Sequence, residues 1–318
     1  MEIEIGEKFS CLTFTGFSLA EQFPDELELD EGTWALRGLP VGLEDHWREW
    51  LGSLRANDIQ QSNFVLCTIR PSQTPEVLDQ ENIDLTQKLY YVMYGLTLQG
   101  VPLYDKGYTL TGANVGGEIQ IRQYGELNEY LSSYGMPVFH VGVAELNRAV
   151  SLANQLHRIY QGGSDWLRLR EGLRILFQGS EERNWGDRLH QFVRALEALI
   201  KPEVGSSKKQ FAHRAQTFAI ANSEATDTLL QIFDIRSKVE HVHSPLDALD
   251  GTEEQRNTLG VRRTRQVDVL SRFALTHILE SEVLLEVFRT DTSIVEFWRI
   301  LDHDRLQVWG ERMNLADV

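Results

Sequence analysis

The chain has 318 residues, with 31 Lys and Arg against 47 Asp and Glu, which gives a formal net charge of -16. Because domains usually hold roughly 100–200 residues, this length predicts two domains or one large one. The negative charge excludes a protein that coats nucleic acid through diffuse positive charge, so any contact with RNA must be local. Apolar residues at 42% and charged residues at 25% exclude a disordered or low-complexity chain and predict a packed core.

Cysteine usage and the first residues bear on the compartment. Cys11 and Cys67 are the two cysteines, far apart in the sequence, so neither a disulfide framework nor a zinc site is expected. Residues 1–5 lack the basic and apolar regions of a signal peptide, and no apolar run approaches the ~20 residues that span a bilayer. We therefore expect a cytoplasmic protein without a membrane partner, a metal or a cofactor.

The negative charge is concentrated in the first half of the chain. Residues 1–150 hold 22 acidic and nine basic residues, a net charge of -13, whereas residues 151–318 hold 25 acidic and 22 basic residues, a net charge of -3. Residues 151–274 alone carry 16 acidic and 18 basic residues, a net charge of +2. This asymmetry favours a division of labour between an acidic first part and a nearly neutral second part.

Up to about residue 125 the sequence favours short strands. Runs rich in β-branched and aromatic residues, or alternating between apolar and polar residues, predict strands at 11–17, 63–69, 88–98 and 118–124. A helix is expected at 43–54, and Gly112 and the pair Gly116-Gly117 are expected to break the strands. We therefore expect a mixed α/β domain over residues 1–140, made mostly of antiparallel strands.

From about residue 143 the apolar period lengthens toward 3.6 residues and proline becomes rare, which predicts helices. The expected helices cover residues 144–160, 165–177, 187–200, 208–220, 223–243, 255–280 and 294–309. Glycine and proline residues between them stop one helix before the next begins. The expected fold is therefore α+β, with an all-α helical bundle over residues 141–318.

The most informative stretch is the run Phe-Asp-Ile-Arg-Ser-Lys-Val-Glu-His at residues 233–241. Apolar residues recur there at three- and four-residue steps and predict one stripe that faces the bundle: Ile232, Ile235, Val239 and Val242. At ~100° per residue, Arg236 falls at the edge of this stripe, while Ser237 and His241 fall on the opposite side. We therefore expect His241 to be exposed or to face a partner chain.

An Arg, four residues and a His at the end of a predicted helix resemble the Arg-x4-6-His signature of HEPN domains, a superfamily of helical bundles with many ribonucleases. The run is similar to that of the Apea-like HEPN branch, which reads aromatic, polar, apolar, Arg, Ser, Lys, apolar, apolar, His, Gly. Residues 188–199 and 211–215 agree with that branch, and the likeness spans roughly residues 165–288. The chain departs from the pattern at Glu240, where the family has an apolar residue, and at Val242-His243-Ser244, which replace the glycine.

The resemblance implies an endoribonuclease of HEPN type that needs no metal and leaves 2',3'-cyclic phosphate and 5'-hydroxyl ends. It implies that Arg236 binds the phosphate and that His241, or His243 in its place, transfers protons, since the unperturbed pKa of His lies near ~6.5. Ser237 is expected to assist by hydrogen bonding, and Glu197 to orient Arg236.

The resemblance further implies a homodimer in which the Arg-x4-His helices of two protomers share one cleft. It also implies an antiviral defence or toxin effector, whose first domain senses or regulates by binding a protein trigger. Basic residues that are candidates for holding RNA phosphates are Lys238, Arg262, Arg263 and Arg265.

Other interpretations stay open at this point. Arg236 and Glu240 have the spacing of a surface ion pair within one helix, and His243 before Ser244-Pro245 has the place of a helix cap. Some HEPN-like bundles are binding modules without catalysis that dock a protein or a nucleotide, and Glu240 favours that alternative. A metabolic enzyme with its site in residues 1–140 has no motif to support it.

Overall fold

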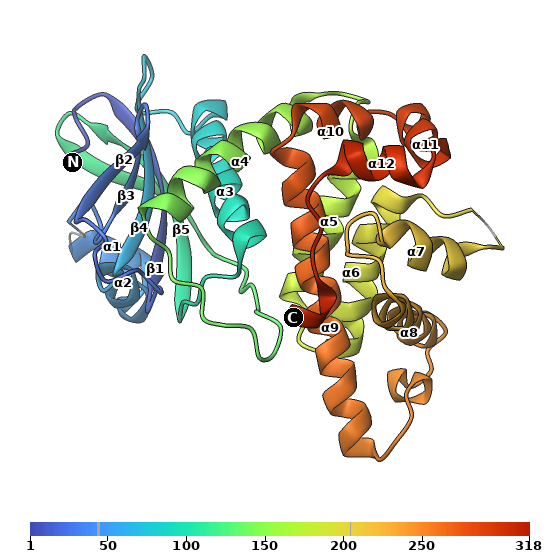
Figure 1. The fold of residues 1–318 in the computed structure, drawn as a ribbon. Helices are drawn as coiled ribbons and strands as arrows, with labels where there is room; N and C mark the ends of the chain where they lie inside the picture. The colour runs from blue at the N-terminus through green and yellow to red at the C-terminus, as the bar shows by residue number, and fades with distance from the viewer. Residues whose placement is uncertain (43–44, 204) are drawn as a thin grey trace. The chain divides into compact units, whose positions relative to one another are not determined.

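The computed structural model describes residues 1–42, 45–203 and 205–318 (Figure 1). The fold is α+β, as the sequence predicts. Contacts within the chain define two compact units: a sheet unit of Met1–Glu129 and Val138–His157, and a helical unit of Tyr130–Pro137 and Arg158–Val318. The expected boundary after residue 140 therefore falls within the sheet unit, which includes the first part of helix α4 (Val143–Gln161).

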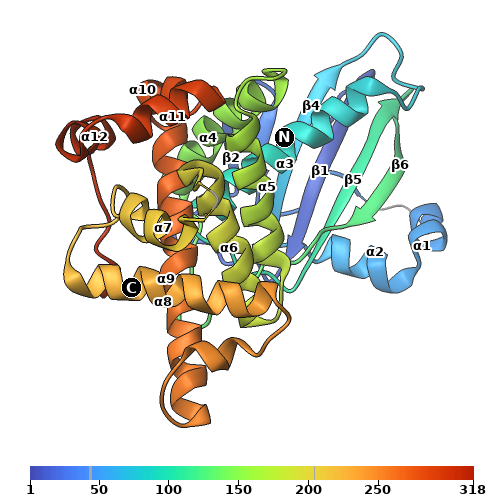
Figure 2. The ribbon, with the colours of Figure 1, turned by 90° about the vertical axis from the view of Figure 1, so that its right-hand side faces the viewer.

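The sheet unit is built on a six-stranded antiparallel sheet in the order β2-β3-β4-β1-β5-β6 (Figure 2). Strands β1 (Glu7–Thr15), β4 (Phe64–Pro71) and β6 (Glu118–Glu126) confirm the strands predicted at 11–17, 63–69 and 118–124. Strands β2 (Glu26–Asp30), β3 (Thr33–Leu36) and β5 (Lys106–Val115) were not among the predicted elements. The Glu, Leu and Asp residues of β2 give little strand signal, so pairing with β3 decides its conformation. The Tyr, Thr and Val residues of β5 were a usable signal that the prediction missed.

Helices cover both faces of this sheet, and this explains why almost every residue of β1 is buried. Phe9 and Cys11 pack in one core cluster with Trp47 of helix α1 (Asp45–Leu51) and Ile59 of helix α2 (Ser53–Gln60). The alternate residues of β1 point to the other face, where helix α3 (Gln80–Gln99) lies. The single helix predicted at 43–54 is wrong in extent, because Gly52 separates α1 from α2; its first two positions lie outside the described residues.

The strand predicted at 88–98 is wrong, because this segment forms most of α3. Three tyrosines and a valine suggested a strand, yet the buried residues follow a helical spacing: Leu85, Leu89, Val92 and Leu96. Asp79 begins the helix, since its carboxylate accepts the backbone N–H of Glu81 while the Asn82 side chain accepts the N–H of Asp79. This capping box outweighs the strand preference of the aromatic residues.

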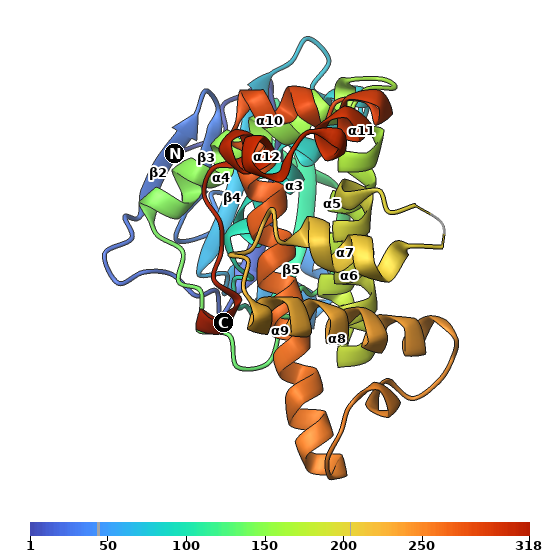
Figure 3. The ribbon, with the colours of Figure 1, turned by 45° about the vertical axis from the view of Figure 1, so that its right-hand side comes forward.

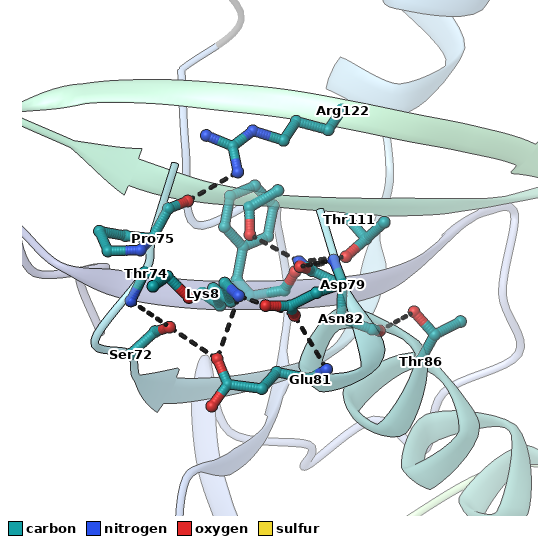
Figure 4. A network of polar contacts seen from close by, with 12 residues as sticks. Lys8, Ser72, Thr74, Pro75, Asp79, Glu81, Asn82, Thr86, Thr111 and Arg122 are labelled. Atoms are coloured by element: carbon teal, nitrogen blue, oxygen red, sulfur yellow. Dashed lines mark hydrogen bonds and ion pairs between the residues drawn. The ribbon is translucent and has the colours of Figure 1, made fainter. Parts of the chain in front are cut away.

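A buried lysine joins β1 to the first turn of α3 (Figure 4). Lys8 has no exposed side-chain surface, and its Nζ lies 2.8 Å from Asp79 Oδ1 and 3.0 Å from Glu81 Oε2. Burial lowers the pKa of Lys8, but hydrogen bonds to the two carboxylates outweigh this effect, so its pKa is raised. Lys8 therefore carries a positive charge that holds α3 against the sheet, and it lacks the lowered pKa of a lysine nucleophile.

The two cysteines, distant in sequence, meet across the sheet. Cys11 on β1 pairs directly with Cys67 on β4, and their sulfur atoms lie 3.3 Å apart as buried free thiols. The hydrogen bond with Cys11, together with burial, raises the pKa of the Cys67 thiol. Both residues therefore act as small apolar groups of the core.

Gly112 lies inside β5, so the break expected there is wrong. The register between β5 and β6 shifts at Thr111 and Gly112, which marks a bulge. A Cβ atom on Gly112 would lie 1.9 Å from the carbonyl oxygen of Gln120, so only glycine allows this close approach. Gly116 and Gly117 form the turn between β5 and β6, as expected, with positive φ angles.

The helical unit confirms a helical second half. Its main helices are α5 (Leu167–Glu181), α6 (Trp185–Ile200), α7 (Ser207–Ala215), α8 (Ser223–Glu240) and α9 (Glu253–Leu279). The single helix predicted at 294–309 is two helices, α11 (Asp291–Arg299) and α12 (Asp302–Trp309), and α10 (Glu282–Val287) precedes them. Across the helices that the structure describes, none combines the length and apolar character required to cross a membrane.

Helix α6 is the centre of this unit, because it packs against α5, α8 and α9. A buried polar cluster fixes it to its surroundings. Asp268 of α9 accepts hydrogen bonds from Arg272 and Ser133, and Arg188 of α6 donates to the backbone carbonyls of Leu131 and Ser132. These contacts fasten the segment 131–133 to the bundle.

Candidate functional site

The candidate site lies where α8 crosses α6 (Figure 3). Asn222 begins α8 by accepting the backbone N–H of Ala225, and the buried residues Ile232 and Ile235 turn one side of the helix into the bundle. This orientation of α8 about its axis places Arg236 at the edge of the buried side, as the sequence predicts. At this edge Arg236 contacts α6.

Arg236 is held by two carboxylates. Its Nη2 donates to Glu197 Oε2 of α6 at 3.0 Å, and its Nη1 donates to Glu240 one turn further along α8. The guanidinium also lies over the Phe233 ring, at 5.5 Å from the ring centroid. Its side chain is only 15% exposed, and its buried Nε has no hydrogen-bond partner among the described residues.

Glu197 makes the contact with Arg236 that the sequence analysis expected. Its side chain is also 15% exposed. Burial raises the pKa of Glu197, while the positive charge and hydrogen bond of Arg236 oppose that rise. The pair is thus a partly buried ion pair in which the carboxylate fixes the orientation of the guanidinium.

Helix α8 ends three residues earlier than predicted, and Val242 is not part of the buried stripe. The N–H of Val242 donates to the carbonyl of Val239 and the N–H of His243 to that of Lys238, which is the Schellman arrangement of a helix end. Val242 occupies the left-handed position of this motif, with φ 59°, and its side chain is 93% exposed. Glycine is preferred there, because a Cβ atom disfavours positive φ.

The two candidate histidines are exposed at this helix end. His241 closes α8, its N–H donating to the carbonyl of Ser237, and His243 follows Val242. Ser237 and Lys238 are half-buried on the last turn of α8. In the part of the chain that the structure describes, no hydrogen bond or ion pair joins His241 or His243 to Arg236. Within one protomer the structure brings Arg236 and Glu197 together but leaves both histidines apart from them.

A third histidine, which the sequence analysis missed, lies close to Arg236. His190 precedes Arg194 and Glu197 on α6 at steps of four and three residues, so the three share one face. Burial lowers the pKa of His190, and the positive charges of Arg236 and Arg194 lower it further. Its Nε2 is buried and has no hydrogen-bond partner among the described residues. A neutral imidazole in this position can accept a proton.

The basic residues of α9 do not act as one patch. Arg262 is exposed, whereas Arg263 is half-buried and donates to Gln231 of α8 and to Gln266. Burial lowers the pKa of Arg263, and the neighbouring Arg262 adds to this effect. Arg265 is half-buried, with a buried Nε that has no hydrogen-bond partner in the described residues. Of the three, Arg262 is the one freely presented to a ligand.

No family model, curated protein or solved structure matches the chain. The described residues also contain no group of three or more His, Cys, Asp or Glu side chains arranged to hold a metal ion.

Proposed function

We propose that the chain is an endoribonuclease of HEPN type in which Arg236, oriented by Glu197, binds the scissile phosphate. The observation that carries this proposal is the 3.0 Å contact between Arg236 and Glu197, which holds a guanidinium of fixed orientation near His190. A planar guanidinium offers paired donors to two phosphate oxygens, so its orientation matters for binding. In this proposal the protein is a defence or toxin effector.

RNA supplies its own nucleophile, so the reaction requires only proton transfer and charge stabilisation. A base removes the proton of the 2'-hydroxyl, whose oxygen attacks the adjacent phosphorus, and an acid gives a proton to the departing 5'-oxygen. The products carry a 2',3'-cyclic phosphate and a 5'-hydroxyl. Arg236 stabilises the additional negative charge on the phosphate oxygens, and a neutral His190 accepts the first proton.

His241 supplies the acid in this scheme. Because His241 is exposed at the end of α8, it reaches a cleft only when a second surface closes over that end. A homodimer through the ends of α8 provides such a surface, with two Arg236 and two His241 side chains around one RNA strand. Lys238 and Arg262 then contact flanking phosphates, where each adds salt-dependent affinity.

Arg236 must exchange a partner before it binds phosphate, because Glu240 occupies one of its nitrogens. The Glu240 side chain is 43% exposed, so this carboxylate can turn into solvent at a small cost in free energy. Replacing it by Glu240→Gln weakens the competing contact by about 0.5–1 kcal/mol, which corresponds to a two- to fivefold increase in cleavage rate.

The deciding experiment incubates the purified full chain with a mixed RNA pool in EDTA and maps the ends of the products. Arg236→Ala and His241→Ala should each lower the rate at least ~100-fold, as expected for loss of phosphate stabilisation or proton transfer. His303→Ala on α12, an exposed histidine, serves as the matched control and should leave the rate unchanged. An inactive wild type, or equal rates in wild type and both variants, would refute the proposal.

A binding module without catalysis is the second candidate, and one observation favours it: Glu197 and Glu240 already occupy the two terminal nitrogens of Arg236. In that case the Arg236 cluster fixes α8 on α6 and the exposed end of α8 docks a partner. Induced expression in cells separates the two candidates. A ribonuclease should arrest growth in a way that His241→Ala abolishes, whereas a docking module should be tolerated.

A further inference from the structure

The two edge strands of the sheet differ in their charges. Figure 2 shows β6 as the last strand on one side, and in the part of the chain that the structure describes no strand pairs with its outer edge. β2, at the other edge, carries only acidic charges, at Glu26, Glu28 and Asp30. Two copies of β2 therefore repel each other, which keeps an edge strand from pairing. β6 lacks this protection, because Arg122 lies between its acidic residues.

The hairpin between β5 and β6 fixes which backbone groups of β6 point outward. The turn Gly116-Gly117, with positive φ angles, joins Val115 to Glu118, and these two residues are paired across the strands. In a two-residue hairpin this flanking pair exchanges hydrogen bonds, and the direction of the backbone groups then alternates along the strand. The N–H and C=O groups of Ile119 and Ile121 therefore point away from β5, toward the open edge.

The side chains of the same stretch alternate between the two faces of the sheet. Ile121 belongs to the core cluster on the face of α1 and α2, and Ile119 packs against that cluster. On the other face Arg122 Nη2 donates to Gln120 Oε1 at 3.0 Å. Glu118 lies two residues before Gln120 and so falls on this second face. One face of the edge thus carries an acid and a base, and the other face carries two isoleucines.

Glu118 and Arg122 have no partner of opposite charge among the described residues. The hydrogen bonds of Arg122 go to neutral oxygens, those of the Gln120 side chain and the Pro75 carbonyl. Glu118 is exposed at the start of β6. A strand that presents a negative and a positive charge four residues apart on one face is complementary to a second copy of itself that runs antiparallel.

These features match β6 of a second copy of the chain. Antiparallel pairing about a two-fold axis at Gln120 sets Glu118 of each copy opposite Arg122 of the other, and Ile119 opposite Ile121. The outward backbone groups of the isoleucines then face each other and form hydrogen-bonded pairs. A register centred on Ile121 leaves the charges unpaired, and one centred on Arg122 sets the two arginines face to face. Charge therefore favours the register centred on Gln120.

We propose that the chain self-associates through β6, which pairs with β6 of a second copy in this register and joins the two six-stranded sheets into one. The pairing involves residues 118–122 of each copy. Because so short a pairing buries little surface, we expect a Kd in the micromolar range. The contact belongs to the sheet unit and does not involve the end of α8, so it does not rest on the proposed ribonuclease activity.

The first experiment measures the Kd of self-association of the full chain by sedimentation equilibrium. Arg122→Glu sets two carboxylates opposite each other at both ends of the pairing and should raise the Kd at least about tenfold. Adding Glu118→Arg to this variant exchanges the charges and should restore the Kd. Arg70→Glu, the same substitution at an exposed residue of the inner strand β4, serves as the matched control and should leave the Kd unchanged.

The second experiment tests the register by cross-linking. Gln120 lies opposite itself across the two-fold axis, so in the Gln120→Cys variant the two introduced thiols lie within reach of a disulfide. Copper phenanthroline oxidises the thiols by accepting their two electrons, and Cys11 and Cys67 are buried. Gln120→Cys should be linked at least about tenfold faster than Glu28→Cys on β2, whose thiols meet only by random collision.

Each of four outcomes would overturn the proposal. They are a wild type that stays monomeric throughout the micromolar range, a Kd that Arg122→Glu leaves unchanged, a double variant that associates as weakly as Arg122→Glu, and equal rates of cross-linking for Gln120→Cys and Glu28→Cys. An association through α8 alone would give the second and fourth of these results. RNA cleavage is not measured in either experiment, so failure here is distinct from failure of the proposed function.

Discussion

The two units bury charged groups in different ways. In the sheet unit a single cation, Lys8, faces two carboxylates that keep contact with solvent, at 31% exposed for Asp79 and 37% for Glu81. In the helical unit two guanidiniums share one carboxylate, and Arg188, Asp268 and Arg272 are 6%, 2% and 7% exposed. The first arrangement tolerates a change because water can enter, whereas the second is closed to solvent.

Neutral oxygen atoms also accept hydrogen bonds from the two buried guanidiniums. Arg188 donates to the carbonyls of Leu131 and Ser132, and Arg272 donates to Ser180 Oγ. Burial lowers the pKa of Arg188, in partial opposition to the nearby Asp268. The carbonyls of Leu131 and Ser132 thus accept from a buried cation, and Ser133 joins the same segment to Asp268 of α9.

Asp268→Ala is expected to have the largest effect on stability. It removes the buried carboxylate that both guanidiniums face, which lowers the free energy of unfolding by about 3–5 kcal/mol. Urea denaturation followed by circular dichroism measures the change. As a control, Glu171→Ala breaks an exposed pair with Arg174 and should lower it by under ~1 kcal/mol. Equal losses of stability in the two variants would show that breaking the buried cluster costs no more than breaking an exposed ion pair.

Lys8→Met should have a smaller effect, because methionine fills the buried space and both carboxylates remain partly in water. The expected loss in the free energy of unfolding is about 2 kcal/mol, below the ~3–5 kcal/mol for breaking a fully buried pair. The same urea titration measures it. A loss as large as that of Asp268→Ala would contradict the distinction between the two units.

The Lys8 network also predicts a dependence on pH. The hydrogen bond from Lys8 lowers the pKa of Asp79 from its ordinary 3.8, and hydrogen bonds from Ser72 and then Lys8 lower that of Glu81 from 4.5. Lowered carboxyl pKa values stabilise the fold above the ordinary values, and this contribution is lost as the pH falls through the folded pKa values. Between pH 4.5 and 3 the wild type should therefore lose more stability than Lys8→Met, as measured by urea denaturation at several pH values. Parallel curves would argue against the network.

The smallest predicted effect is a gain. Val242→Gly relieves the left-handed strain at the end of α8 and should raise the free energy of unfolding by about 0.5–1 kcal/mol, because glycine adopts positive φ without a Cβ clash. Val283→Gly on α10 is the matched control, since it exchanges an exposed valine in a helix and should lower stability by about 0.5–1 kcal/mol. Thermal unfolding measures both changes, a gain in stability for Val242→Gly and a loss for Val283→Gly. A lower stability of the Val242→Gly variant would mean that the Val242 side chain makes stabilising contacts in the folded protein.

Much of the helical unit and part of the candidate site could be predicted from local pattern. The contact between Arg236 and Glu197 followed from the phase of α8 and a nearby acidic residue on α6. His190 was missed, although its spacing to Arg194 and Glu197 was a usable signal. A histidine on a helix can be assigned a role only when the residues of other helices that lie near it, here Arg236, are known. The left-handed turn at Val242 gave no signal, since valine is an unfavourable residue for it.

The sequence by itself determined the α+β class, the positions of most helices and three strands, and the uneven distribution of charge, since periodicity, capping and composition are local properties. The tertiary structure alone decided the meeting of Cys11 with Cys67 and the burial of Lys8. Each of these depends on which strands pair and which faces are covered. Such contacts join residues far apart in the chain, so no local pattern specifies them.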